Sequence, residues 1–281
     1  MKFIKSILFS IMYVAIYFIL QVVIQLVMLF GLGYSFAMEN LTLTIILSSI
    51  IGFLIYWGIV KLRKQDLVSA FSFRKFDYRQ VPFFMGLGFG LQYLLQGLML
   101  IFNLEDKFPE HAQTMKLIFE GGSPVMVMLS VIIFAPFIEE ILFRGLIINE
   151  LKSKIPLILV IPIQALMFGV IHGNWLQIAY AFILGILLGL VSIWSRSVWT
   201  GIILHMSMNG SPLLISLFWN DNQVEQFIME YRIPVTVISG VLVMVIMYFI
   251  YRNRRTDFDV SAIEIPASGT YLEGEIKHEN S

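Results

Sequence analysis

Long apolar runs separated by short polar segments occupy most of this chain between residues 7 and 251. A helix needs about 20 consecutive apolar residues to cross the hydrocarbon of a bilayer. By that criterion the pattern predicts eight membrane-spanning helices, at residues 7–33, 41–61, 81–103, 124–149, 156–173, 176–195, 198–218 and 234–251. The expected fold class is therefore an all-α, polytopic transmembrane helix bundle that takes up residues 1–252.

Positive charge is concentrated in alternate connections. The Lys and Arg residues precede the first predicted helix and follow the second, fourth, sixth and eighth, for example Lys64, Lys152, Arg196 and Arg252. The connections at the other side, 104–123 and 219–233, are acidic, and 104–123 is either a plain loop or an amphipathic segment along the interface. Because short cytoplasmic loops carry the excess of Lys and Arg, we expect both termini in the cytoplasm. Residues 253–281 are polar and Glu-rich, which predicts a disordered cytoplasmic tail.

Composition sharpens this picture. Hydrophobic residues make up 58% of the chain and charged residues 14%, which is far more apolar than a soluble domain requires. The absence of cysteine excludes disulfides, Cys-ligated zinc and thiol catalysis. A formal net charge of zero, with no basic aromatic stripe, argues against a nucleic-acid partner. The expected surroundings are a lipid bilayer.

Five ionisable residues fall inside predicted spans, at Glu139, Glu140, Arg144, His172 and His205. A charge at the centre of a bilayer costs about 2.5–3.5 kcal/mol on insertion scales, so such groups pair or face a wet cavity. Each of them alone also has an ordinary structural explanation, such as a satisfied packing histidine or a Glu–Arg pin. Five together on three helices predict a functional site.

Spacing separates these groups. Glu140 and Arg144 stand four residues apart and can pair on one helix face. Successive residues point about 100° apart, so Glu139 cannot share that face and is left to a cavity. His205 and Asn209 repeat the four-residue spacing, although Asn209 alone would more simply form an interhelical hydrogen bond.

The set Glu139, His172, His205 and Asn209 contains what peptide hydrolysis requires. Glu139 could take a proton from water that His172 positions, and His205 and Asn209 could stabilise the oxyanion. Glu139, His172 and His205 are also a suitable three-ligand set for a divalent metal such as zinc. The residues leave the two mechanisms open.

Three clusters carry a resemblance to a known family. Glu139-Glu140-Ile-Leu-Phe-Arg144 is similar to its EExxxR motif, Phe168-Gly-Val-Ile-His172 to its FxxxH motif, and His205-Met-Ser-Met-Asn209 to its HxxxN motif. The chain thus resembles the CAAX protease and bacteriocin-processing family (CPBP, or Abi) of intramembrane proteases, which includes the type II CAAX prenyl endopeptidases. The resemblance covers about residues 81–218.

The resemblance implies an eight-helix intramembrane endopeptidase, often labelled a metalloprotease. Its catalytic groups would be Glu139, His172, His205 and Asn209, with Glu140, Arg144 and Phe168 in supporting roles. We expect a membrane-associated peptide or protein substrate and a bacterial plasma membrane, and prenyl-CAAX cleavage as a family label only. Oligomeric state stays open.

Two other functions compete with this one. A non-proteolytic membrane regulator or bacteriocin self-immunity protein could use the same fold. A proton-coupled transporter would also need intramembrane Glu and His, although no repeated halves are evident. One expectation conflicts with convergence, because the predicted boundaries put Glu139 near mid-membrane, His172 toward the outer end of its helix and His205 toward the inner part. The helices would have to tilt, or the boundaries shift by about a turn.

Overall fold

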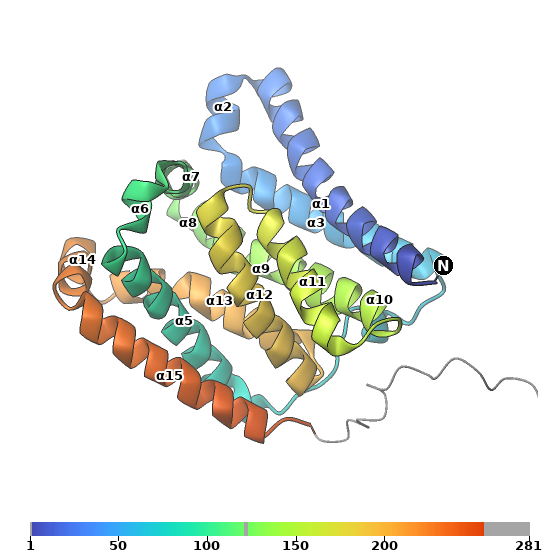
Figure 1. The fold of residues 1–281 in the computed structure, drawn as a ribbon. Coiled ribbons are helices and arrows are strands. Elements are labelled where there is room, and N and C mark those ends of the chain that lie inside the picture. The colour runs from blue at the N-terminus through green and yellow to red at the C-terminus, as the bar shows by residue number, and fades with distance from the viewer. Residues whose placement is uncertain (1, 121–122, 256–281) are drawn as a thin grey trace, which may run out of the picture.

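The computed structural model describes residues 2–120 and 123–255, which are helical with no strand among them (Figure 1). Residues Pro124–Lys152 form one long helix, called here the Pro124–Lys152 path, in which α-helical and π-helical segments alternate. The other long helices are α1 (Lys2–Leu32), α3 (Leu41–Leu62), α5 (Val81–Ile101), α11 (Leu157–Val170), α12 (Trp175–Ser195), α13 (Val198–Ser216) and α15 (Arg232–Arg252). Each of the eight predicted segments coincides with a helix, so the all-α prediction is confirmed.

Six of the described helices are long and apolar enough to cross a membrane: α1, α3, the Pro124–Lys152 path, α12, α15, and α5 with its preceding turn. The expectation of about eight spans is consistent with this number, with two differences. α11 has only 14 residues, and α13 carries the polar sequence around His205 and Asn209. α11 is shorter than expected because the chain turns after Val170 and Gly173 takes a positive φ of 80°.

Short helices fill the connections. On the basic side lie α4 (Leu67–Ala70) and the 3-10 turn η1 (Tyr78–Gln80). The acidic connections hold α6 (Leu104–Lys107), α7 (Pro109–Glu120) and α14 (Asp221–Glu230), while α2 (Tyr34–Glu39) joins α1 to α3. The structure therefore favours helix over plain loop for most of segment 104–123. Residues 256–281 of the predicted tail lie outside the described residues.

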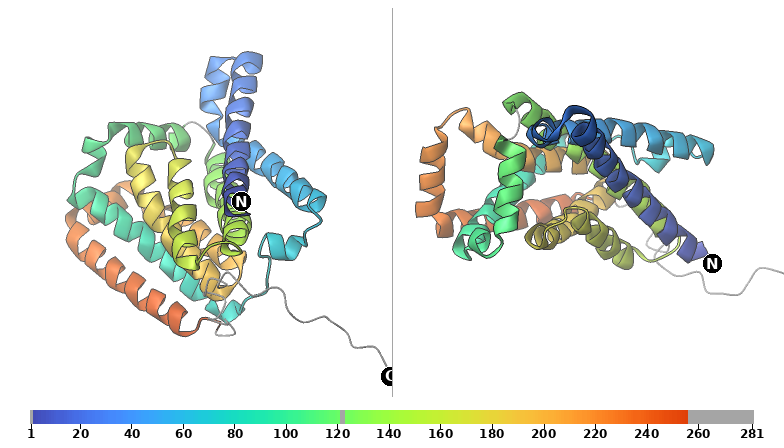
Figure 2. Two further views of the ribbon diagram at one scale, coloured as in Figure 1. Left: turned by 45° about the vertical axis from the view of Figure 1, so that its right-hand side comes forward. Right: turned by 90° about the horizontal axis from the view of Figure 1, so that it is seen from above.

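The long helices divide into two groups. α1 and α3 diverge from one another and are joined at their far end by α2, apart from the main bundle (Figures 1 and 2). In the main bundle α5 packs against both α13 and α15, and α11 packs against α12 as a hairpin. The Pro124–Lys152 path contacts α3 and α13, so it lies between the two groups.

This central path changes helix type along its length. It consists of α8 (Pro124–Val127), the π-helical segment η2 (Met128–Phe134), α9 (Ala135–Glu140), the π-helical segment η3 (Ile141–Ile147) and α10 (Ile148–Lys152). In a π-helix each N–H reaches back five residues, and such segments are frequent at functional sites. The N–H of Ala135 accordingly donates to the carbonyl of Ser130. Glu139 and Glu140 thus end a short α-helical stretch with π-helical segments at both sides.

Gly88 sets the closest approach of α5 to α13. A Cβ atom at this position would lie 2.3 Å from the carbonyl oxygen of Leu204 and 2.8 Å from the backbone nitrogen of Met208. Both of these are backbone atoms of the turn that carries His205. Small residues at a helix interface allow such backbone contact in membranes.

We expect Gly88→Ala to lower the free energy of unfolding by about 1–3 kcal/mol, because an added methyl group must push two backbones apart. The measurement is the thermal unfolding midpoint of the purified protein in detergent. Gly58→Ala on α3 is the matched control, since a Cβ there meets nothing within 4 Å. Equal midpoints for the two variants would contradict the packing argument.

Candidate active site

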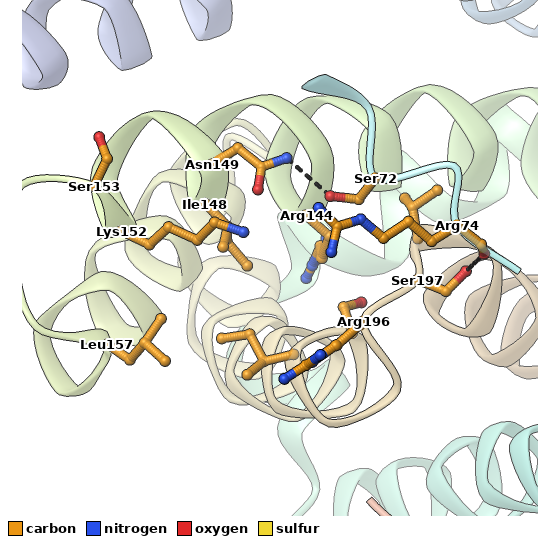
Figure 3. Close-up of a pocket in the computed structure, with 13 residues that line it drawn as sticks. Ser72, Arg74, Arg144, Ile148, Asn149, Lys152, Ser153, Leu157, Arg196 and Ser197 are labelled. Atoms are coloured by element: carbon orange, nitrogen blue, oxygen red, sulfur yellow. Dashed lines mark hydrogen bonds between the residues drawn. The ribbon is translucent and has the colours of Figure 1, made fainter. Parts of the chain in front are cut away.

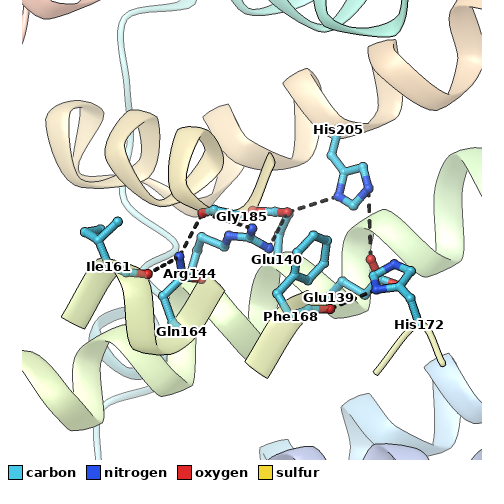
Figure 4. Close-up of polar contacts among 9 residues, drawn as sticks. All are labelled: Glu139, Glu140, Arg144, Ile161, Gln164, Phe168, His172, Gly185 and His205. Carbon is cyan, nitrogen blue, oxygen red and sulfur yellow. Dashed lines mark hydrogen bonds and ion pairs between the residues drawn. The ribbon is translucent and has the colours of Figure 1, made fainter. Parts of the chain in front are cut away.

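Glu140 joins two helices through one carboxylate oxygen. Its Oε1 accepts a hydrogen bond from Arg144 Nη1 at 2.9 Å and lies 3.1 Å from His205 Nδ1, which comes from α13 (Figure 4). The side chains of Glu140 and Arg144 are both 0% exposed. The predicted Glu140–Arg144 pair is therefore present, but its description as a pin within one helix was incomplete, because Glu140 also holds the histidine.

Glu139 lies on the other side of the same imidazole. Its Oε2 is 4.0 Å from His205 Nε2, and its side chain keeps 12% of its surface exposed. That separation is too long for a direct hydrogen bond, so an oxygen atom of water or substrate could contact both groups. The two neighbouring glutamates thus lie toward opposite nitrogens of one ring, Glu140 in contact and Glu139 at a distance.

His172 lies beyond the end of α11, in the turn that follows it. Its Nδ1 is 2.8 Å from the carbonyl oxygen of Phe168, one turn earlier in the chain. A carbonyl can only accept, so this contact assigns the N–H to Nδ1 and leaves the Nε2 of a neutral ring as an acceptor. The assignment suits a group that receives a proton from water or orients water.

The ring of Phe168 lies among the charged and imidazole groups. It meets His172 and His205 edge-on, with ring centroids 5.0 Å and 5.9 Å apart. The guanidinium of Arg144 lies over the same ring, 4.3 Å from its centroid. A cation over an aromatic face is stabilised by the ring quadrupole, so Phe168 helps to hold Arg144 and separates it from the histidines.

Asn209 points to the backbone of η2. Its Nδ2 donates to the carbonyl oxygen of Val131 at 2.9 Å. In the π-helical register that carbonyl would accept the N–H of Pro136, which a proline lacks. An unsatisfied carbonyl inside a membrane is costly, and the amide of Asn209 replaces the missing donor. One N–H of Asn209 is occupied in this way and its second remains.

Glu139, His172 and His205 therefore come together from α9, the turn after α11, and α13 (Figure 4). The conflict over membrane depth is resolved because His172 lies outside its helix, on a turn that reaches back to the others. Whether these residues are catalytic stays a prediction.

Comparisons with known proteins agree with this geometry. Residues 121–211 match the family described as type II CAAX prenyl endopeptidase Rce1-like. This segment, about a third of the chain, is therefore similar to that family. The resemblance carried by the three motifs is thus confirmed, and the matched range contains Glu139, His172, His205 and Asn209.

Two curated proteins are also similar to part of this chain. The membrane-embedded CAAX protease MroQ of Staphylococcus aureus (strain USA300) is 28% identical over 110 residues, which cover 37% of this chain and 44% of MroQ. The putative membrane peptidase YdiL of Bacillus subtilis (strain 168) is 26% identical over 103 residues, 37% of this chain and 42% of YdiL. The chain thus matches less than half the length of each relative. No solved structure matches the chain. The apolar helices, together with this similarity to a membrane protease family, indicate an integral membrane protein.

Sequence reasoning missed Gln164, which lies within the matched segment. Its Nε2 donates to the carbonyl oxygens of Gly185 at 2.8 Å and Ile161 at 3.1 Å, and Gly185 also lies 3.5 Å from Arg144 Nη2. A signal was present, because Gln164 is a lone amide in an apolar run, four residues before Phe168 and eight before His172. Those three positions share one face of a helix.

Gly201 was also missed. A Cβ at this position of α13 would lie 2.5 Å from Glu140 Oε2 and 2.9 Å from Ser192 Oγ. Both of these oxygens are buried without a hydrogen-bond partner. Gly201 therefore provides the space for the carboxylate of Glu140, and no local sequence pattern reveals that requirement.

The predicted zinc ligands are Glu139, His172 and His205. In the described part of the chain, no three His, Asp or Glu side chains are arranged to hold a metal ion. Glu139 Oε2 and His205 Nε2 are both turned inward, but at 4.0 Å from each other, and His172 uses Nδ1 for a carbonyl. Zinc binding stays a prediction, and no chemical step below depends on it.

His111 lies in α7, away from the candidate catalytic residues. It is buried, with its ring edge-on to Tyr180 at 5.7 Å between centroids. Burial lowers the pKa of His111, because the charged imidazole loses its water, and the nearby Glu105 opposes this effect. Burial thus favours the neutral form of this histidine, whose ring packs α7 onto α12.

The hydrogen bond from Asn209 to Val131 yields a coupling prediction. Asn209→Ala leaves the carbonyl of Val131 without a donor, so we expect the free energy of unfolding to fall by about 1–3 kcal/mol. Pro136→Ala restores an N–H that can reach this carbonyl. The loss caused by Asn209→Ala should then be clearly smaller in the Pro136→Ala background. Thermal unfolding of the four proteins in a double-mutant cycle measures the coupling, and strict additivity would contradict the assignment.

Gly201→Ala should displace the carboxylate of Glu140 and, with it, the ring of His205. We expect a loss of stability of about 1–3 kcal/mol together with an altered nitrogen-15 NMR signal of the His205 imidazole. Gly240→Ala on α15 is the control, because its Cβ would meet only Leu94 Cδ1, at 3.6 Å. An unchanged His205 signal in Gly201→Ala would show that the carboxylate does not need this space.

Proposed function

We propose that this protein is an intramembrane endopeptidase that hydrolyses a peptide bond in a membrane-associated peptide or protein. The observation that carries the proposal is the placing of Glu139 Oε2 at 4.0 Å from His205 Nε2, with His205 held at its other nitrogen by Glu140. The Rce1-like match over residues 121–211 and the printed names of both relatives support a membrane protease.

In the proposed first step Glu139 acts as the general base. It takes a proton from a water molecule, and Arg144 does not compete for its carboxylate because that guanidinium is paired with Glu140. His172 Nε2 accepts the second hydrogen of this water and orients it. The resulting hydroxide attacks the carbonyl carbon of the scissile peptide bond. General-base catalysis of this kind contributes about 10²–10⁴ in rate.

The carbonyl oxygen becomes an oxyanion in this step. The carboxylate of Glu140 at Nδ1 stabilises a positively charged His205, whose Nε2–H donates to the oxyanion. The second N–H of Asn209 is the other proposed donor, fixed in place by the bond that the first makes to Val131. Glu139 then passes its proton to the leaving amine as the C–N bond breaks, giving a carboxylate and an amine.

The assignment of supporting roles follows from contacts. Arg144 neutralises Glu140 without access to the reacting atoms, and Phe168 keeps the guanidinium away from the two histidines. The proposed substrate enters from the bilayer, because the site lies within an integral membrane protein. A bacterial plasma membrane is the proposed location, in keeping with the sources of both relatives.

The test compares cleavage of membrane proteins by the wild type and by single variants, in membranes from cells that lack the gene. Glu139→Gln, His172→Ala and His205→Ala should each lower the cleavage rate by at least about 100-fold, because each removes a group that contacts the reacting atoms. New protein ends identified by mass spectrometry are the readout. Bound zinc is measured on the wild type and the same variants after each has been purified.

Glu225→Gln on α14 is the matched control, because it removes one exposed carboxylate far from the site and should leave cleavage unchanged. Retained cleavage in Glu139→Gln would overturn the proposal. If that variant also restores the phenotype of the deletion strain, the protein acts as a non-proteolytic regulator or immunity protein. Proton uptake into liposomes that depends on Glu139 would instead indicate a transporter.

A further inference from the structure

A cavity opens at the basic end of the bundle, away from Glu139. It has a volume of about 370 Å³ and lies between the loop before α5, the end of the Pro124–Lys152 path and the connection from α12 to α13 (Figure 3). This volume falls in the range of about 300–1,000 Å³ that is typical of small-molecule sites. The positive-inside rule predicts that this end of the protein meets the cytoplasmic headgroup layer.

The lining of the cavity is strongly positive. Arg74, Arg144, Lys152 and Arg196 contribute to it, and none of the described lining residues is acidic. Arg74 and Lys152 extend toward one another from opposite sides (Figure 3), and the charges of Arg74 and Arg196 act on Lys152. Among the described residues, neither Arg74 nor Lys152 takes part in an ion pair. Neighbouring cations repel one another, and an anion bound between them removes this repulsion.

Buried polar atoms at the inner end of the cavity also lack partners. Arg144 and Ser192 are 2% and 7% exposed, and the Nε of Arg144 and the Oγ of Ser192 make no hydrogen bond. Buried polar groups are nearly always paired, so each such atom calls for an explanation. A guanidinium N–H donor and a hydroxyl together favour an oxyanion.

The outer wall is held in place by hydrogen bonds of both side chains and backbone. Ser197 Oγ donates to the carbonyl of Arg74 at 2.6 Å, and the N–H of Val198 donates to the carbonyl of Ser72 at 3.0 Å. Asn149 Nδ2 donates to Ser72 Oγ at 2.8 Å. These bonds tie the loop before α5 to the start of α13 and to the central path. The cations are thus presented by a prearranged frame, which lowers the entropic cost of binding.

We propose that this cavity binds a phosphate-type anion, supplied either by the headgroup of an anionic phospholipid or by free phosphate. Arg74 and Lys152 contact the phosphoryl oxygens from the two sides, and Ser192 and Arg144 lie at the inner end. Arg144 also binds Glu140, so the anion would share one guanidinium with the candidate catalytic group. Basic pockets between transmembrane helices on the cytoplasmic side suit lipid headgroups.

The first arm of the test uses inorganic phosphate. Thermal unfolding of the purified protein in a neutral detergent is followed as phosphate rises, with potassium chloride keeping the ionic strength constant. The second arm compares nanodiscs of phosphatidylglycerol with nanodiscs of phosphatidylcholine. A saturable stabilisation by phosphate indicates a free anion, and stabilisation by phosphatidylglycerol alone indicates a headgroup. Neither readout depends on cleavage, so this proposal can fail separately from the proposed protease activity.

Arg74→Gln with Lys152→Gln should weaken the apparent affinity by at least about tenfold, because each cation near a membrane surface contributes about 1 kcal/mol. Lys75→Gln with Arg79→Gln is the matched control, since it removes the same number of positive charges from exposed positions between α3 and α5 that do not line the cavity. The control should bind within about twofold of the wild type. Lys152→Arg keeps the charge and should retain binding, which covers the case in which the double variant does not fold.

Two results would overturn the proposal. One is the absence of any saturable difference between phosphate and chloride and between the two lipids in the wild type. The other is stabilisation only by a peptide with a free C-terminal carboxylate, lost in Arg74→Gln with Lys152→Gln and absent for the amidated peptide. That result would assign the cavity to the end of a substrate.

Discussion

The ion pair between Glu140 and Arg144 is the constraint on which the rest of the site depends. Both side chains are fully enclosed in a mainly apolar bundle, and removing one partner of such a pair is strongly destabilising. The surroundings of the pair are built to make it tolerable: Phe168 covers the guanidinium and Gly201 leaves space for the carboxylate. Glu140 Oε1 also contacts His205 Nδ1. One carboxylate oxygen therefore both neutralises Arg144 and orients the candidate catalytic histidine.

The mixed helix around α9 links this pair to the other candidate groups. Its π-helical segments alter the rotation of the chain at both sides of Glu139 and Glu140 and leave a carbonyl at Val131 that Pro136 cannot satisfy. Asn209 supplies the missing donor from the same helix that carries His205. This hydrogen bond joins α13 to η2, directly before α9, and α9 carries Glu139 at 4.0 Å from His205.

Arg144 also connects two regions of opposite character. On one side lies a site in which a carboxylate and two imidazoles surround a space for water. On the other lies a cavity lined by cations at the basic end of the bundle. A guanidinium has five N–H donors, so it can serve Glu140, a backbone carbonyl and an anion together. In this arrangement the positive charge of Arg144, which stabilises the Glu140 carboxylate inside the membrane, would also be available to a ligand at the membrane surface.

The sequence by itself determined the positions of the eight helices, the Glu140–Arg144 pair and the resemblance to a family, because apolar runs, four-residue spacing and ordered motifs are local properties of the chain. Only the tertiary structure decided which nitrogen of His205 each glutamate meets, that His172 lies in a turn, and that Asn209 binds a backbone carbonyl. It also revealed Gln164, Gly201 and the cationic cavity. These features depend on distances between helices far apart in the chain and on π-helical turns, and the pattern of one segment contains neither.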